Sequence, residues 1–260
     1  MSRLSRVPFL LLLFSSVFII TGCAGSATGR MLAPYRQAAK ERPDDARAHY
    51  DLGSAALNVE RYAEARKAFL RCLDLTPDDL EARFKLVKSL DGLDRRGEVL
   101  PGLRAILEID STHIGVNEML ADRCYGIILT FEMIGQSEPP HRGQVMNARQ
   151  KVLLNQFDIQ HDQFPALCRE AAATYERLCR LDPEEPRYWC GLGAVRNQQE
   201  DFRGAEKAYY TAQRLDPKYL QDDILNNTIF AYSRGNRKFV PPEPRIFFLT
   251  FGGETFVILP

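Results

Sequence analysis

The chain has 260 residues, of which 45% are hydrophobic and 26% are charged, a composition ordinary for a soluble protein. Its 34 basic and 34 acidic residues balance, so the net charge gives no reason to expect nucleic acid or a strongly acidic surface as a partner. A chain of this length holds one or two domains unless internal repeats set its organisation.

The amino terminus has the features of an export signal. Arg3 and Arg6 form a positive start, and residues 7–20 form a 14-residue apolar run. Because this run is short, and a proline and two serines interrupt it, a cleaved signal is favoured over a membrane span. Residues 1–22 are therefore predicted to be a signal peptide.

The apolar run ends in the stretch ITGC at residues 20–23, which resembles the lipobox of bacterial lipoproteins. The resemblance implies cleavage before Cys23, acylation of its thiol and its new amino group, and firm attachment to a bilayer. Residues 23–30 would then be the lipidated cysteine and a short tether. In that family, the Ala24 that follows the cysteine favours the outer membrane. The alternatives are an ordinary cut near residues 24–27 or an uncleaved anchor.

Residues 46–79 form a unit whose spacing recurs in residues 186–219. The first copy has Leu52-Gly53, Ala65, Phe69 and Pro77, and the second has Leu192-Gly193, Ala205, Tyr209 and Pro217. In both copies the glycine, alanine and proline are 12 residues apart. Apolar residues at helical spacing predict two helices in each unit, which the small residue allows to approach closely and the proline ends. Such a pair cannot bury its apolar stripe alone, so neighbouring units must stack on it.

This skeleton resembles the tetratricopeptide repeat (TPR), a helix–turn–helix unit of about 34 residues. The resemblance implies an all-α TPR solenoid over residues 31–234. Residues 31–43 match the second helix of a unit, so the array is expected to open with a lone helix. Residues 80–113 match as a degenerate unit. His49 stands where the family usually has Trp, and core packing is its expected role.

The pattern blurs in residues 114–183. The interval from Ser111 to Pro183 spans 72 residues, which is two repeats and a few residues more. Helices are predicted over residues 114–134, 145–161 and 165–180, with a break at residues 136–143, where two adjacent prolines favour an extended backbone. One of the four expected helices is therefore missing or absorbed.

A helix over residues 220–234 is expected to cap the solenoid, and residues 235–260 follow as a proline-rich spacer and a β-hairpin. Two β-rich runs flank Gly252-Gly253, which is a hairpin signature. Pairing Phe251 with Glu254 leaves both faces of the hairpin apolar. We therefore expect it either to bury against the solenoid or to pair with a partner chain.

No catalytic or metal-binding motif is present in the sequence. The four histidines form no HExxH or i, i+4 pair, and the GxSxG, P-loop and GxGxxG patterns are absent. The five cysteines other than Cys23 contain no CxxC pair. They are expected to be buried thiols, with a Cys179–Cys190 disulfide left open. The sequence therefore predicts no catalytic residue, no metal and no cofactor.

The TPR resemblance implies binding residues on the first helix of each unit, since these helices line a concave groove that reads a peptide or a partner helix. The matching residues are Arg47, Tyr50, Ser54, Leu57 and Asn58 in the first unit, Glu81, Phe84, Lys88 and Asp91 in the second, and Arg187, Ala194, Asn197 and Gln198 in the last. A solvated helix face is the alternative for each of them. Tyr50 and Ser54 take the places of the Lys and Asn that clamp chaperone C-termini in some family members, so that specificity is not expected.

These patterns predict a non-enzymatic, lipid-anchored scaffold that holds other proteins in the bacterial cell envelope, at the outer membrane and facing the periplasm. TPR lipoproteins of this build commonly serve pilus biogenesis, outer-membrane assembly or cell-wall enzyme complexes. The alternative is an envelope enzyme or enzyme regulator whose site lies in the irregular residues 114–165.

Overall fold

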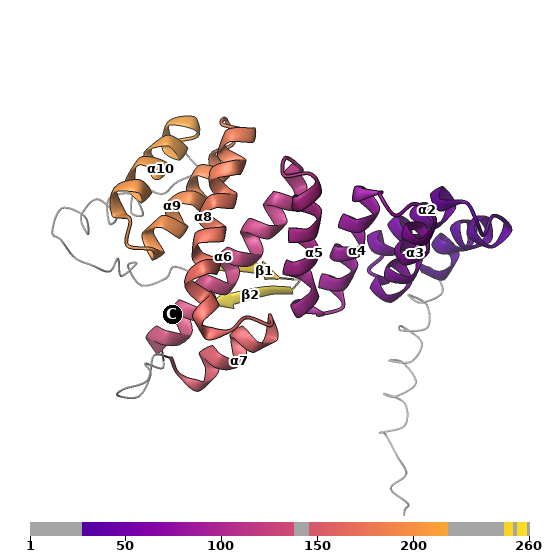
Figure 1. Cartoon of the computed structure of the whole chain (residues 1–260), viewed down its shortest axis with the longest axis horizontal. Coiled ribbons are helices and arrows are strands. Elements are labelled where there is room, and N and C mark those ends of the chain that lie inside the picture. Colours follow the sequence, from indigo (N-terminus) through magenta and orange to yellow (C-terminus); the bar gives the residue numbers. More distant parts are fainter. Residues whose placement is uncertain (1–27, 138–145, 218–246, 252–253, 259–260) are drawn as a thin grey trace, which may run out of the picture. The chain divides into compact units, whose positions relative to one another are not determined.

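The structure is a computed structural model that describes residues 28–137, 146–217, 247–251 and 254–258. The chain divides into two compact parts, Met1–Ser89 and Leu90–Pro260, which are called the first unit and the second unit below, whereas each pair of helices is called a repeat. Outside residues 247–251 and 254–258, the regular secondary structure described is helical (Figure 1). The predicted signal peptide, Cys23, the capping helix over residues 220–234 and the proline-rich spacer lie outside the described residues. So does most of the break predicted over residues 136–143, but the prediction is wrong for its first two residues, 136–137, since they continue a helix.

The first unit contains a helix over residues 28–41, followed by α2 (Ala46–Asn58), α3 (Tyr62–Leu75) and most of α4 (Leu80–Gly92). Asp45 caps α2 by accepting a hydrogen bond from the backbone N–H of Arg47 at 2.9 Å, as an N-cap aspartate does. Glu60 takes the left-handed conformation (φ 59°) and turns the chain between α2 and α3. The helix–turn–helix predicted for residues 46–79 is present.

Gly53 and Phe69 set the distance between α2 and α3. The Phe69 ring is fully buried together with Leu32, Ala56 and Ala65. A Cβ atom added to Gly53 would lie 2.7 Å from Phe69 Cε1, closer than side chains pack. The repeat over residues 186–219 has the same contact, because a Cβ at Gly193 would lie 2.6 Å from Tyr209 Cε1. The small residue is therefore required opposite an aromatic ring.

The lone helix over residues 28–41 is present, but it does not bury the positions that match Ala65 and Phe69. Met31 is 61% exposed and Tyr35 is 42% exposed, whereas Leu32 and Ala39 are buried. The bidentate ion pair between Arg36 and Glu64 (2.6 and 2.7 Å) fastens the same side of the helix to α3. In complete repeats, Ala65 and its counterparts pack against the first helix of their own repeat, and the described residues hold no such helix before residue 28.

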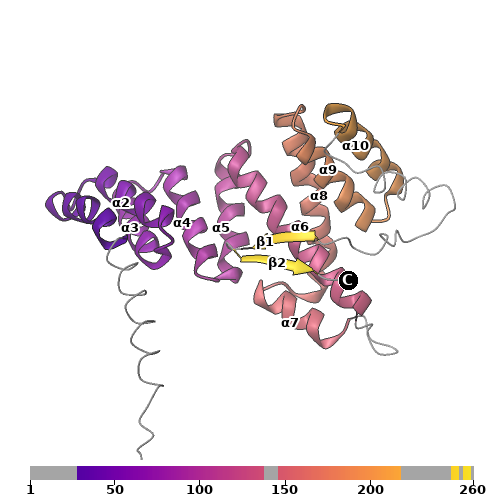
Figure 2. The same cartoon turned by 180° about the vertical axis from the view of Figure 1, so that it is seen from behind.

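The second unit contains α5 (Arg96–Ile109), α6 (Ile114–Ser137), α7 (Ala148–Gln156), the short 3-10 helix η1 (His161–Gln163), α8 (Phe164–Leu181), α9 (Pro186–Gln198) and α10 (Phe202–Leu215). The helices α9 and α10 form the predicted pair within residues 186–219 and lie side by side (Figures 1 and 2). Their turn again uses a left-handed residue, Glu200 (φ 62°).

The irregular region resolves into two long helices and a short one. The long helix predicted over residues 114–134 is confirmed as α6, but the long helix over residues 145–161 is wrong, since α7 has only nine residues. A capping box between Asn147 and Gln150 starts α7, and left-handed Asp158 (φ 54°) follows its end. The helix α6 pairs with α8, and α7 packs against α6 (Figure 2). The missing repeat helix is therefore replaced by α7.

Side-chain amides attach α7 to the last turns of α6. Gln150 Nε2 donates to the carbonyl of Phe131 at 2.9 Å, and Asn147 Nδ2 donates to that of Ile134 at 3.2 Å. Both amide side chains are buried, and the carbonyl of Ile134 is one of the last four in α6, which no N–H of the same helix can satisfy. This contact fixes where α7 begins.

His49 has a different role from the core packing that its Trp-like position predicted. It is half-buried, and its Nε2 lies 2.9 Å from the carbonyl oxygen of Pro43, to which it donates. Arg83 donates to the carbonyl of Pro77 (2.7 Å), and Trp189 to that of Pro183 (2.8 Å). The repeat position held by His49, Arg83 and Trp189 thus donates a side-chain hydrogen bond to the carbonyl of the proline six residues earlier.

Two short strands follow, β1 (Phe247–Phe251) and β2 (Glu254–Ile258), which pair antiparallel with Phe251 opposite Glu254. Their turn and their side chains lie outside the described part, so the predicted hairpin and its burial stay predictions. Among the helices of the described residues, none is both long enough and apolar enough to cross a membrane.

Candidate functional site

The expected groove residues of the first unit gather around two aromatic rings on α2 and α4. The Tyr50 ring packs edge-on against Phe69, with ring centroids 6.0 Å apart. The Arg47 guanidinium lies 5.2 Å from the Tyr50 centroid, and Lys85 Nζ lies 5.3 Å from it. Two cations therefore contact one ring, an arrangement that its electron-rich face stabilises.

The second ring of this face is the buried Phe84, with Lys88 Nζ at 4.3 Å from its centroid. Arg47 and Lys85 also pair with acids on their own helices, at 3.0 Å and 3.9 Å. Lys88 is exposed, and no carboxylate of the described residues forms an ion pair with it. The face formed by α2 and α4, the α2–α4 face, thus offers one unpaired ammonium, which lies beside the Phe84 ring.

Other predicted residues of this face differ in exposure. Leu57 is partly buried and packs against the core of the unit, whereas Asn58 and Glu81 are exposed. Ser54 is partly buried, and its Oγ atom is buried without a hydrogen-bond partner in the described part of the chain. A buried hydroxyl that lacks a partner is costly, and such groups are unusual in folded proteins.

In the second unit, α6 contributes two acids that the sequence analysis missed. Glu118 accepts hydrogen bonds from Arg187 and from the hydroxyl of Tyr188 (2.5 Å), and Asp122 accepts one from the hydroxyl of Tyr175 at 3.2 Å. They lie one repeat length after Phe84 and Lys88, so continuing the register past residue 113 could have found them. The predicted Arg187 is thus joined to α6 by an ion pair.

Asp122 is an exposed residue. The surrounding protein nevertheless removes part of the water around its carboxyl group, and this desolvation raises the pKa of the carboxyl. The cation of Arg187 and the hydrogen bond from Tyr175 oppose that rise only in part. Desolvation also raises the pKa of Tyr188 to about 12, with a contribution from Glu118. An exposed but poorly hydrated carboxylate is available to a cation from outside.

The remaining predicted residues of the second unit are mostly engaged. Asp91 pairs with Arg123 at 2.5 Å, and desolvation still raises the pKa of its carboxyl. Ala194 packs against the Ala205–Tyr209 core, and Gln198 is exposed. Asn197 is only 8% exposed, and its Oδ1 has no partner among the described residues. In the repeat register Asn197 matches Leu57 of the first copy, whereas the counterpart of Ser54 is Ala194.

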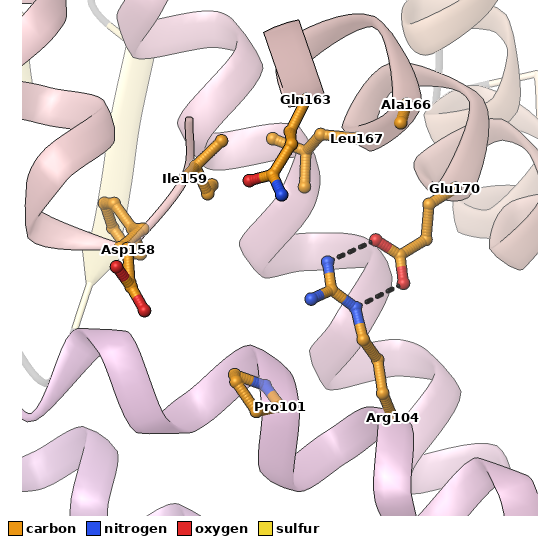
Figure 3. Close-up of a pocket in the computed structure, with 9 residues that line it drawn as sticks. Pro101, Arg104, Asp158, Ile159, Gln163, Ala166, Leu167 and Glu170 are labelled. Atoms are coloured by element: carbon orange, nitrogen blue, oxygen red, sulfur yellow. Dashed lines mark hydrogen bonds and ion pairs between the residues drawn. The ribbon is translucent and has the colours of Figure 1, made fainter. Parts of the chain in front are cut away.

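A pocket of about 380 Å³ opens in the second unit beside the irregular region. Figure 3 shows its lining, which comes from α5, the segment after α7 and the start of α8: Pro101, Arg104, Phe157, Asp158, Ile159, Gln163, Ala166, Leu167 and Glu170. Arg104 holds the Glu170 carboxylate with two hydrogen bonds of 2.8 and 2.7 Å, which raises the pKa of the guanidinium. Asp158 supplies a second carboxylate.

Five cysteines are described, and all are free thiols. Cys72, Cys124 and Cys179 are buried, and Cys168 and Cys190 are partly buried, as the sequence predicted for thiols that act as small hydrophobes. Burial raises the pKa of Cys179 to about 12 and that of Cys190 to about 11. Within the described residues, no group of histidines, cysteines and acids is arranged to hold a metal ion.

Residues 32–79 and 167–219 match the model of the tetratricopeptide repeat family. Each matched segment covers a second helix followed by a complete helix pair, so the chain carries TPR repeats and the resemblance is confirmed for these segments. No curated protein matches the chain.

Solved structures share its fold. A double mutant of MamA from RS-1 is 16% identical, covers 80% of this chain and 94% of its own length, and has a TM-score of 0.50. MamA from Desulfovibrio magneticus RS-1, from residue 41 to its end, is 16% identical over 82% and 96%, with a TM-score of 0.49. YrrB, described as a TPR protein with an unusual peptide-binding site, is 17% identical over 85% and 87%, with a TM-score of 0.48. At these identities the likeness concerns the fold alone.

Proposed function

We propose that the protein is a non-enzymatic scaffold that holds other envelope proteins against the first helices of its TPR repeats. Lipid on Cys23 would attach it to the outer membrane of a bacterium, facing the periplasm. The TPR repeats support the scaffold role, because a stack of helix pairs presents extended surface for a partner rather than an enclosed reaction site. The lipobox-like stretch at residues 20–23 supports the anchor.

The observation that carries the scaffold role is that two of the three buried side-chain polar atoms without a partner in the described residues lie at predicted groove positions, while the third, Arg66 Nε, lies on α3. Ser54 Oγ in the first unit and Asn197 Oδ1 in the second both belong to residues that the repeat register assigns to the binding groove. A partner that brings a donor to each of them would remove the cost of leaving them unpaired.

The chemistry of the two faces differs. The α2–α4 face carries the unpaired ammonium of Lys88 beside the Phe84 ring, which suits a partner segment that brings a carboxylate. In the second unit, the exposed Asp122 suits a basic side chain, whereas Glu118 is already paired with Arg187. We therefore expect the scaffold to select a partner surface that carries both acidic and basic segments.

The test is affinity capture of the full-length protein from its native envelope after crosslinking. Lys88→Glu should reduce the capture of partners, because it reverses the charge of the unpaired ammonium. The matched control is Lys67→Glu, the same change at an exposed lysine on the second helix α3, which should capture partners as the wild type does. Equal capture by both variants and the wild type would contradict the proposed groove.

The anchor has its own test. Cys23→Ser removes the thiol that would be acylated, so it should abolish lipid attachment and the lipoprotein type of processing. Mass spectrometry of the mature amino terminus measures this directly. An unmodified terminus that starts at another residue in the wild-type protein would rule out the anchor while leaving the scaffold role open.

The pocket keeps an envelope enzyme or enzyme regulator as a second candidate function. Four of its lining residues come from the irregular residues 114–165, and Asp158 places a carboxylate there. Glu170 is already bound by Arg104, so Asp158 is the acid that a reaction would use. Hydrolytic activity of the purified protein that Asp158→Asn removes would establish this function in place of the scaffold role.

A further inference from the structure

The lone helix over residues 28–41 carries an apolar stripe that faces solvent. Met31 is 61% exposed and Tyr35 is 42% exposed, and residues four apart share one side of a helix. Pro34, between them, is exposed as well. The buried Leu32 and Ala39 lie on a neighbouring side, where the helix packs against the first unit. Exposed apolar residues that cluster in this way indicate a contact surface.

The repeat register shows what this stripe lacks. In the next repeat, Ala65 and Phe69 occupy the same two positions as Met31 and Tyr35, and both are fully buried against α2. The lone helix is the second half of a repeat whose first helix is not among the described residues. Among the described residues no helix covers this stripe, although it matches positions that are packed in the next repeat.

The position of the helix in the chain selects the occupant. Only residues 24–27 lie between Cys23 and the first described residue of the helix. Even a fully extended chain of that length would hold the start of the helix within about 17 Å of an acylated Cys23. A stripe of Met31, Pro34 and Tyr35, beside the exposed Arg30, has the mixture of apolar, aromatic and basic groups that suits a membrane interface.

We propose that the stripe formed by Met31, Pro34 and Tyr35 lies against the lipid bilayer, so that the first unit rests on the membrane instead of extending away from it on a flexible tether. The proposal rests on the anchor put forward in the proposed function. It adds a second contact to the acyl chains, and that contact would fix which side of the first unit faces the membrane.

The test places a tryptophan on each side of the helix in the full-length protein. Met31→Trp reports on the stripe, and the matched control Ala33→Trp reports on an exposed position two residues on, at the opposite side of the helix. A helix is about 10 Å in diameter, so the two indoles would differ in depth by about that distance. The protein is reconstituted in vesicles of phosphatidylethanolamine and phosphatidylglycerol, with and without brominated acyl chains, and quenching of the single native tryptophan, Trp189, is measured in the wild type and subtracted.

We expect Trp at position 31 to be quenched at least threefold more than Trp at position 33. Equal quenching at the two positions would overturn the proposal. A blue shift of the position-31 emission that grows with protein concentration in the absence of vesicles would also overturn it, since the stripe would then bind a second copy of the chain.

Mass spectrometry of the same samples separates this inference from the anchor. An acylated protein with equal quenching keeps the anchor and removes the membrane contact. An unacylated protein in which position 31 is still the more strongly quenched keeps the membrane contact and removes the anchor. An unacylated protein without preferential quenching overturns both.

Discussion

Replacing Gly53 by alanine tests the close approach of α2 and α3 that the repeat spacing predicts. The new Cβ would lie 2.7, 2.8 and 2.9 Å from three carbons of the Phe69 ring. That ring is completely buried and cannot move into solvent, so the change overpacks the core at a cost of about 1–3 kcal/mol. Alanine also favours the helix over glycine by about 1 kcal/mol. The net expectation is a loss of about 1 kcal/mol in the free energy of unfolding.

Gly97 provides a control of opposite sign. A Cβ added there would lie 3.6 Å from Asp158 Cβ, an ordinary contact, so Gly97→Ala should stabilise the protein by up to about 1 kcal/mol. Urea unfolding followed by far-UV circular dichroism measures both variants, provided that the dependence on urea concentration is unchanged.

A second substitution identifies the partner of the new methyl group. Phe69→Leu reduces the ring that the methyl group meets, so it should cost less in the Gly53→Ala background than in the wild type, by about 1–2 kcal/mol. If Gly53→Ala stabilises the protein as Gly97→Ala does, the tight contact between the two helices does not exist and the reasoning is refuted.

Three further predictions concern the core, a carboxylate and the carboxy terminus. Leu192→Ala should cost about 2–5 kcal/mol in urea unfolding, because Leu192 is 2% exposed; unchanged melting would contradict its place in the core. The raised pKa of Asp122, above its ordinary value of 3.8, means that protonation favours the fold, a contribution present below pH 3.8 and lost as the pH rises through the folded-state pKa. Asp122→Asn should therefore raise the melting temperature at pH 7 but not at pH 3, and an equal change at both would contradict this. Deleting residues 245–260 should lower the melting temperature if they cover apolar surface of the same chain, and should instead abolish partner capture without loss of stability if they pair with another protein; a truncated protein that keeps both properties would contradict both readings.

The regular repeats could be predicted because each part of their signal is local. Gly53 and Phe69, like Gly193 and Tyr209, are brought together by a single turn between adjacent helices, so their spacing in the sequence fixes their meeting in space. Helix starts are also local signals, since Asp45 caps the start of α2 and Pro186 is the first residue of α9. Local sequence therefore determines both the type and the limits of these elements.

The short helix α7 could not be predicted in the same way. Its start depends on the contacts of Asn147 and Gln150 with carbonyl groups of α6, and its exposed Val152 (58%) gives an apolar signal without burial. The candidate site has the same difficulty, because the hydrogen bond from Tyr175 to Asp122 joins α8 to α6 across the inserted α7. Pairings across an insertion have no fixed spacing in the sequence.

The lone helix shows a further limit. The repeat pattern of residues 31–43 correctly predicts a helix, but a repeat pattern cannot tell whether a partner helix lies opposite a given side. Met31 and Tyr35 match buried positions and are exposed, whereas the neighbouring Leu32 is buried in a cluster with Ala56 of α2 and Phe69 of α3.

The five free thiols make the order of events during folding matter. Once the helices have formed, Cys124 and Cys179 are buried and the thiolate that reacts with oxidants is suppressed, since burial raises the pKa of both. An unfolded chain has no such protection, so in an oxidising compartment helix packing competes with disulfide formation between cysteines that have no native partner. Refolding under oxidising conditions should therefore give a lower yield of natively folded protein than refolding with a reductant. The same oxidant added after folding should leave the structure unchanged. The yield of correctly folded protein then depends on the rate of folding rather than on the stability of the folded state.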